Sequence, residues 1–290
     1  MRKRFPTHIV VFLLPAAAIY TLFMIYPLFT SLWLSLNNAV DNGPERFVGL
    51  ANYLRLFQAP EFSGPFWNAL WNNIKFFLIH MAVQNPVGLL LAVLLSRQLA
   101  GTAFYRTVIF TPTVLSVVIV GFAWRLILNP QWGLHTTLLG LPDTALLTVA
   151  LISVWQNVGI PMMLFTAALI RIPTEYFEAA RIDGASPWRI FWSIQLPLIL
   201  PTLGIVAVLT FVGNFNAFDI VFATQGALGG PNFSTDILGT FFYRTFMGFQ
   251  LQLGDPYMGS TVAGVMLLII LAGVVAYLLG WQRRIQELQY

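Results

Sequence analysis

Long apolar stretches dominate the chain, and polar residues gather in the short segments between them. About 20 apolar residues suffice to cross a hydrocarbon core about 30 Å thick. Six stretches are long enough, at 9–36, 70–95, 107–128, 146–170, 197–222 and 259–281. Their apolar residues run on without a period-two alternation, which favours helices over barrel strands. The pattern therefore predicts an all-α polytopic membrane protein, a single domain with six transmembrane helices.

Proline and an N-terminal basic segment complicate this pattern without changing it. Pro15, Pro27, Pro86, Pro112 and Pro161 fall inside the stretches. Transmembrane helices tolerate proline where neighbouring groups satisfy the freed carbonyls, so we expect kinks at these positions. The basic start resembles a signal peptide, but the apolar run that follows is too long, and we expect an uncleaved first span.

Composition supports the membrane interpretation and excludes several kinds of chemistry. Only 9% of the residues are charged and 58% are apolar, whereas roughly a quarter of a soluble domain is charged. The chain has no cysteine, and its histidines are far apart, so we expect no metal site and no catalytic residue. No glycine-rich phosphate loop ends in lysine, so any ATP that drives the protein is hydrolysed by another polypeptide. The net charge of +4 indicates membrane-flanking anchors rather than nucleic-acid binding.

The distribution of basic residues predicts the orientation. Cytoplasmic segments are enriched in Lys and Arg. A cytoplasmic N-terminus gives the inner side Arg2, Lys3, Arg4, Arg97, Arg106, Arg171, Arg181, Arg189, Arg283 and Arg284. The outer side then has Arg46, Arg55, Arg125 and Arg244. We therefore expect both termini to be cytoplasmic, in a multi-pass protein of the cytoplasmic (inner) membrane.

The connection between the fourth and fifth stretches, 172–197, carries helix signals that the other connections lack. Thr174 is a candidate N-cap, and Gly184 a candidate helix end because glycine accepts a positive φ. Ser186 followed by Pro187 is typical of the start of a second helix. The segment therefore predicts a cytoplasmic helix–turn–helix between two spans.

The surface of the first of these helices permits two interpretations. Ala179 and Ala180 leave room for a partner to approach closely, and Glu178 offers it a charge. A short helix of this kind suits the groove of another protein. An amphipathic loop that lies on the bilayer without a partner fits the residue types equally well.

The spacing within this loop matches a known signature. Its residues follow the pattern EAA-x3-G-x9-I-x-LP, filled by Glu178, Ala179, Ala180, Gly184, Ile194, Leu196 and Pro197. The signature is that of permease subunits of binding-protein-dependent ABC importers, and the Asp183-Gly184-Ala185 triplet also fits. Phe218-Asp219, Gly229–Pro231 and Tyr243–Phe246 resemble a pattern of sugar permeases. The chain thus resembles the maltose/glycerol-phosphate-type carbohydrate uptake family, and within it the first of two paired permeases.

The resemblance implies an assembly. A second, homologous permease subunit would share the pathway, and two copies of a cytoplasmic ATPase would each hold one EAA helix. An extracytoplasmic solute-binding protein would deliver a sugar substrate. The chain itself would need no cofactor, because the partner ATPase would use ATP and Mg.

Polar residues inside two stretches are candidates for the solute pathway. Ser153, Gln156, Asn157 and Ile160 follow the i, i+3, i+4, i+7 spacing of one helix face, and the fifth stretch offers Gly213, Asn214 and Ala217. Amide groups suit the hydroxyls of a neutral sugar, and the resemblance places the sugar site of the family in these stretches. Alternatively these amides join helices, and the partner permease holds most of the sugar site.

Other polar residues and two other functions are alternatives to this interpretation. His80, Gln84 and Asn85 in the second stretch favour interhelical hydrogen bonds. An ion-coupled secondary transporter that acts without an ATPase is the alternative function. It would need buried ionisable groups or an inverted repeat, and only Lys75, His80 and Asp219 approach the first condition. An intramembrane enzyme would need a catalytic or metal cluster, which the sequence does not suggest.

Overall fold

A computed structural model describes residues 7–38, 44–96, 101–129, 131, 137–250 and 253–282, and within these ranges the chain is mostly helical. It divides into two compact units, Met1–Gly64 with Phe242–Val265 and Pro65–Phe241 with Met266–Tyr290. Several basic residues that we assigned to the inner side lie outside the described residues, namely Arg2, Lys3, Arg4, Arg97, Arg283 and Arg284.

The first unit contains a long helix, a short hairpin and a surface helix. Its elements are α1 (Thr7–Tyr20), a π-helical turn (Thr21–Ile25), α2 (Tyr26–Ser35), the strands β1 (Asn37–Asn38) and β2 (Arg46–Phe47), and α3 (Ala51–Gln58). The strands are antiparallel, with Asn37 opposite Phe47. The buried Asn52 donates from Nδ2 to the carbonyls of Ser35 (3.0 Å) and Asn37 (2.8 Å). This amide therefore satisfies a carbonyl left free at the end of α2.

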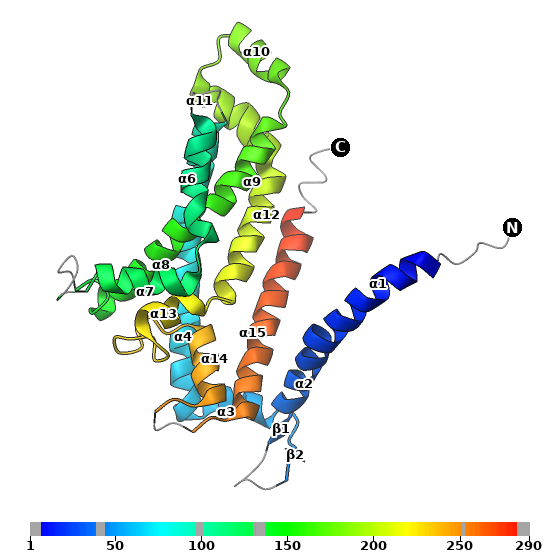
Figure 1. The fold of residues 1–290 in the computed structure, drawn as a ribbon, viewed down its shortest axis with the longest axis vertical. Helices are drawn as coiled ribbons and strands as arrows, with labels where there is room; N and C mark the ends of the chain where they lie inside the picture. Colours follow the sequence, from blue (N-terminus) through cyan, green and yellow to red (C-terminus); the bar gives the residue numbers. More distant parts are fainter. Residues whose placement is uncertain are drawn as a thin grey trace, which may run out of the picture. The chain divides into compact units, whose positions relative to one another are not determined.

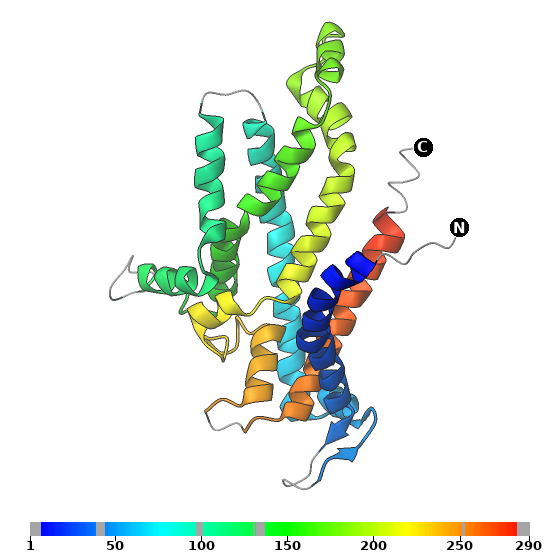
Figure 2. The same ribbon diagram turned by 45° about the vertical axis from the view of Figure 1, so that its right-hand side comes forward.

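Three helices contribute to both units, α4 (Pro60–Ile79), α14 (Leu238–Met247) and α15 (Pro256–Ala276). The second unit adds a π-helical turn (His80–Gln84), α5 (Asn85–Leu95), α6 (Thr102–Val114), α7 (Val117–Ile127), α8 (Pro142–Asn157), α9 (Gly159–Ile170), α10 (Thr174–Ile182), α11 (Pro187–Ile190), a π-helical turn (Phe191–Gln195), α12 (Leu196–Phe215), α13 (Asp219–Gln225) and a terminal π-helical turn (Tyr277–Gln282). Within this unit α9 packs against α5, α6 and α12. The helix α10 extends beyond the ends of α9 and α12 (Figures 1 and 2).

Three of the π-helical turns have a common cause in the sequence. Each ends two residues before a proline, namely Pro27, Pro86 or Pro197. Proline lacks an N–H, and its ring clashes with the carbonyl four residues earlier. A wider turn absorbs this clash, because the residue before proline then bonds the carbonyl five residues back. These prolines therefore alter the helix locally and do not end it.

Four apolar helices are continuous and long enough to cross a membrane, Val11–Ser35, Pro60–Leu95, Pro187–Phe215 and Pro256–Trp281. We predicted the fifth stretch as 197–222, but the helix begins ten residues earlier and ends at Phe215, and Asp219 begins the separate helix α13. The loop's second helix is therefore the first part of this long helix.

The third and fourth predicted spans are each divided into two helices. The axes of α6 and α7 differ by 94°, because Leu115 and Ser116 between them have extended backbones. The axes of α8 and α9 differ by 43°. Pro161 explains this smaller bend, because it cannot donate to the carbonyl of Asn157. Counting each bent pair as one span gives up to six spans among the described residues.

One apolar core joins the three helices around the loop. It contains Ala92 of α5, Phe165 and Leu169 of α9, and Ile199 and Val206 of α12, with Ile172. The helices α5 and α9 approach closely at Gly88, where an added Cβ would lie 2.9 Å from Cγ of Pro161. The absence of a side chain at Gly88 therefore permits the contact between α5 and α9.

Candidate functional site

The turn after α10 is a regular helix end built on Gly184. This residue has φ +77°, and no other group lies within 4 Å of a Cβ added there. The N–H of Ala185 donates to the carbonyl of Ala180 (2.9 Å), and that of Gly184 to Arg181 (3.0 Å). These two bonds form a Schellman motif, whose left-handed position glycine occupies without strain.

We predicted capping residues at the starts of both loop helices, and only the second helix has the predicted cap. The hydroxyl of Ser186 accepts a hydrogen bond from the N–H of Arg189 (3.3 Å), with Pro187 in the first turn. The predicted cap at Ser186 is therefore present. Thr174 is not an N-cap, because Pro173 takes the cap position and no side chain bonds the helix start. The helix begins one residue earlier than we expected, where the fixed φ of Pro173 sets its direction.

The signature residues of α10 lie on an exposed helix. Glu178 and Ala179 are exposed, and Ile182 keeps 86% of its surface accessible. Ala179 and Ile182 are three residues apart and share a face of the helix. This face is small, partly apolar and uncovered among the described residues of the chain.

The opposite side of α10 is anchored. Phe177 packs on the core that joins α5, α9 and α12. The later signature residues, Ile194, Leu196 and Pro197, lie in the π-helical turn and at the start of α12. A displacement of α10 would therefore act directly on the helices that meet in this core.

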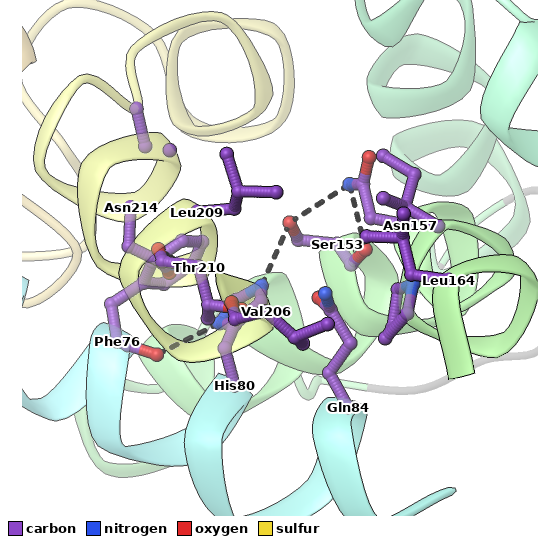
Figure 3. A pocket seen from close by; sticks show the side chains of 14 residues that line it. Phe76, His80, Gln84, Ser153, Asn157, Leu164, Val206, Leu209, Thr210 and Asn214 are labelled. Carbon is purple, nitrogen blue, oxygen red and sulfur yellow. Dashed lines mark hydrogen bonds between the residues drawn. The ribbon is translucent and has the colours of Figure 1, made fainter. Parts of the chain in front are cut away.

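The second unit also contains a cavity of about 340 Å³. It lies among α4 and its π-helical turn, the α8–α9 bend and α12 (Figure 3). Its wall includes six of the seven predicted pathway residues, Ser153, Asn157, Ile160, Gly213, Asn214 and Ala217. The fold thus brings together polar residues from stretches about 55 positions apart.

The seventh predicted pathway residue, Gln156, does not line this cavity. Its Nε2 donates to the carbonyl of Leu115 (3.1 Å), and its backbone carbonyl accepts from the hydroxyl of Thr113 (2.9 Å). Leu115 is at the bend between α6 and α7, where the backbone loses its helical partners. Gln156 therefore stabilises this bend and does not line the cavity, although its spacing places it on the same helix face as Ser153 and Asn157.

His80 and Gln84 belong to the cavity wall as well. Nδ1 of His80 lies 2.8 Å from the carbonyl of Phe76, and Nε2 lies 3.0 Å from Oγ of Ser153 (Figure 3). A carbonyl only accepts, so Nδ1 carries the hydrogen, and in the neutral ring Nε2 accepts from the Ser153 hydroxyl. The predicted interhelical bond of His80 is present, but its position beside the cavity was missed. The sequence contains a sign of this position, because Phe76, His80 and Gln84 recur every four residues.

Asn85 also follows the interhelical expectation. Its Oδ1 accepts from the hydroxyl of Thr210 (3.2 Å), which joins α5 to α12. Thr210 itself lines the cavity. This bond therefore holds one polar wall residue against a neighbouring helix.

Two buried amide oxygens of the wall have no hydrogen-bond partner among the described residues, Oδ1 of Asn214 and Oε1 of Gln84. A buried acceptor left unpaired costs about 1–3 kcal/mol. Both oxygens are almost inaccessible, so neither faces the open part of the cavity. The described residues contain no cluster of three or more histidine or carboxylate groups that could hold a metal ion. The other polar side chains of the wall, among them Ser153 and Asn157, suit hydrogen bonding to a polar solute.

Comparison with known proteins gives one consistent result. Residues 84–285 match the family described as "Binding-protein-dependent transport system inner membrane component". The chain is 34% identical over 282 residues to "Probable ABC transporter permease protein YurN" of Bacillus subtilis, covering 90% of this chain and 91% of the relative.

Two further comparisons agree. The identity is 30% over 279 residues with "Trehalose/maltose transport system permease protein MalF" of Thermococcus litoralis, covering 92% and 90% of the two chains. A chain of the bacterial alginate ABC transporter, solved in complex with alginate pentasaccharide-bound periplasmic protein, superposes with a TM-score of 0.75. It is 21% identical, with 91% of each chain covered, and shares the fold.

Proposed function

The chain belongs to the family of binding-protein-dependent transport system inner membrane components, and we propose that it forms half of the solute pathway of an ATP-driven sugar importer. It is a multi-pass permease subunit of the cytoplasmic membrane and works within a transporter complex. The relative named as a trehalose/maltose permease supports sugar as the solute class.

The exposed helix α10 is the single observation that carries the coupling role. Its face with Ala179 and Ile182 is uncovered, and its Phe177 is anchored in the core of α5, α9 and α12. A partner that seats α10 in a groove would therefore move these helices together. We assign this groove to a separate cytoplasmic ATPase.

The proposed topology has six spans with both termini cytoplasmic. It counts α6 with α7, and α8 with α9, as one span each. The predominance of basic residues on the inner side supports this orientation, which puts α10 in the cytoplasm.

The proposed complex contains a second homologous permease, two ATPase copies and an extracytoplasmic solute-binding protein. ATP and Mg are bound by the ATPase, and this chain carries neither a cofactor nor a catalytic residue. Its family membership supports this division of tasks.

The proposed mechanism is alternating access driven through α10. ATP closes the two ATPase copies and moves α10, and Phe177 transmits this movement to α9 and α12. Both helices also line the cavity, with Leu164 and Val206 close to the shared core. The cavity therefore changes its access when the core shifts, and hydrolysis resets the cycle.

A cross-linking experiment tests the coupling role. The chain has no cysteine, so Ala179→Cys creates a unique reactive site. In membranes that contain the full complex, a reagent with one thiol-reactive and one photoreactive end should join this residue to the ATPase. Asp143→Cys, on the exposed first turn of α8, is the matched control and should give no such product. Equal cross-linking of both variants, or of neither, would refute the contact between α10 and the ATPase.

A further inference from the structure

The helix α7 lies across the direction of the neighbouring span. Its axis differs by 94° from that of α6, and Figure 1 shows the two helices nearly at right angles. The 13 residues of α6 rise about 20 Å from its cytoplasmic start in the proposed topology, within a hydrocarbon core about 30 Å thick. The helix α7 therefore begins in the outer part of the membrane and runs close to the membrane plane.

The two faces of α7 have different surroundings. One face packs against α13, where a Cβ added at Gly121 would lie 2.6 Å from the Cβ of Ala223. The opposite face is apolar, and its side chains are 49–66% exposed within the described part of the chain, namely Val118, Ile119, Phe122 and Leu126. An apolar face of this kind is what an interfacial helix buries among lipid acyl chains.

A tryptophan pair supports this depth for α7. The rings of Trp124 on α7 and Trp155 on α8 are in edge-to-face contact, with centroids 5.6 Å apart, and Trp155 is exposed. Tryptophan is enriched at membrane–water interfaces, because its ring is apolar and its N–H requires a polar partner. The exposed side of α7 therefore suits the level of the lipid headgroups.

A cavity of about 210 Å³ lies at the end of this helix. Arg125 and Asn129 line it, together with Thr224 and Gln225 of α13 and the apolar or backbone surfaces of Leu128, Leu139 and Gly140. The hydroxyl of Thr224 donates to the carbonyl of Ile220 (2.7 Å), and Nε2 of Gln225 donates to that of Leu139 (2.9 Å). These two side chains therefore have their donors engaged within the protein.

The donors of Arg125 and Asn129 are available to a ligand. Arg125 forms no ion pair with any described carboxylate, Asp143 at the start of α8 included. Oδ1 of Asn129 accepts from the N–H of Gln131 (2.7 Å), and its Nδ2 has no acceptor among the residues that the structure describes. A guanidinium beside an amide N–H is a donor set that suits the oxygens of a phosphate group.

We propose that this cavity binds the phosphate of an anionic phospholipid in the outer leaflet, with Arg125 as the ion-pair partner and Asn129 as a second donor. Phe122 and Leu126 would lie along the acyl chains of the same lipid, because both are exposed one turn or less from Arg125. The ligand is thus amphipathic, whereas a water-soluble anion leaves this apolar surface uncovered and a zwitterionic lipid already neutralises its own phosphate. The site is separate from the solute cavity and rests on the proposed orientation of the chain.

The experiment measures which lipid lies next to α7. The purified complex of the chain with its partner permease and ATPase, both freed of cysteine, is placed in phosphatidylcholine nanodiscs. The chain has no cysteine of its own, so Leu126→Cys carries a single bimane label. Phosphatidylglycerol with brominated acyl chains should quench this label more strongly than brominated phosphatidylcholine at equal mole fraction, because one arginine enriches an anionic lipid about fivefold.

Three variants in this labelled background identify the cation that causes the excess quenching. Arg125→Gln should remove the excess, and Arg125→Lys, which keeps the charge, should retain most of it. Arg46→Gln removes an exposed cation of the other unit and should leave the excess unchanged. The comparison of the two lipids on the unsubstituted Arg125 stands even where Arg125→Gln fails to assemble.

Four results would overturn the inference. Equal quenching by both lipids would show that no headgroup is recognised, and no quenching by either would show that another protein covers this face. Excess quenching that disappears on addition of inorganic phosphate would indicate a site for free anions, and excess quenching that survives Arg125→Gln would exclude Arg125. The proposed function is judged separately, by recovery of the ATPase with the chain, since the quenching does not depend on the solute.

Discussion

Gly184 shows how a single backbone angle determines the geometry of the loop. Its φ of +77° allows the chain to reverse after α10 and enter the long helix that begins at Pro187. A residue with a branched Cβ is strained at this angle by about 1–2 kcal/mol or more, although no neighbour would obstruct it. The strain therefore acts on the direction of α10 and not on the packing of the spans.

Replacing Gly184 by Val should abolish ATP-driven uptake and leave the amount of chain in the membrane nearly unchanged. Uptake of radiolabelled sugar and membrane content by immunoblot are the measurements. Gly184→Asn is the matched control, because Asn tolerates positive φ, and it should retain most of the uptake. Normal uptake by Gly184→Val would contradict a coupling role for the turn.

The bond between His80 and Ser153 permits a second test at this scale. Ser153→Ala removes the donor to Nε2 of His80 and leaves a buried acceptor unpaired, which should cost about 1–3 kcal/mol of stability. The thermal midpoint of the purified complex should fall. Ser193→Ala makes the same change at an exposed position and should leave the midpoint unchanged. Equal midpoints for the two variants would show that the bond does not stabilise the protein.

The limit of sequence reasoning is visible in neighbouring residues. Asn157 and Gln156 are adjacent amides on nearly the same helix face, and both were predicted to line the pathway. Asn157 lines the cavity, while Gln156 satisfies the carbonyl of Leu115. The bend at Leu115 is not visible in the apolar pattern, so the partner of Gln156 could not be found from the sequence.

Among the elements, α10 and its anchor connect the exposed signature to the cavity helices. Phe177 is the contact of α10 with the core of α5, α9 and α12. Removing its ring leaves α10 free to move without moving these helices. The contribution of this ring to the coupling can be measured by comparing the amount of ATP hydrolysed with the amount of sugar transported.

Phe177→Ala should therefore lower uptake severalfold while the complex still hydrolyses ATP. The measurement is the ratio of sugar transported to ATP hydrolysed in reconstituted vesicles. Phe177→Leu keeps an apolar side chain in contact with the core and should restore most of this ratio. An unchanged ratio in Phe177→Ala would mean that other contacts transmit the movement of α10 to the spans.

Glu178 offers a test of the outer surface of the same helix. It is exposed, so a charge reversal should leave the fold intact. Glu178→Lys should reduce the ATPase recovered with the affinity-tagged chain. Glu45→Lys reverses an exposed charge in the other unit and should leave recovery unchanged. Full recovery of the ATPase with Glu178→Lys would show that Glu178 does not contribute to the contact with the ATPase.

The positions of the helices were largely predictable, but their interruptions were not. Apolar length located all six helical stretches, because continuous burial in lipid leaves a continuous apolar sequence. Proline predicted local disturbance at Pro27 and Pro86, which the π-helical turns absorb. The bend of 94° between α6 and α7 begins three residues after Pro112, where we expected a kink. Its size depends on the extended backbones of Leu115 and Ser116, which the sequence does not reveal.

For the whole molecule, the sequence reveals the family, whereas the cavity becomes visible only in the fold. The EAA signature identified the family from the sequence, and the comparisons confirm the family. The cavity required the fold, because its wall joins α4, α8, α9 and α12. The basic residues that set the predicted orientation are partly outside the described ranges, so the topology stays a prediction.

The most direct test of the central claim is transport by reconstituted vesicles. The complete complex, with its binding protein outside and ATP inside, should accumulate an uncharged sugar, and omission of the ATPase should abolish accumulation. A proton or sodium gradient should not replace ATP. Accumulation driven by such a gradient in vesicles that lack the ATPase would contradict the account and indicate an ion-coupled transporter.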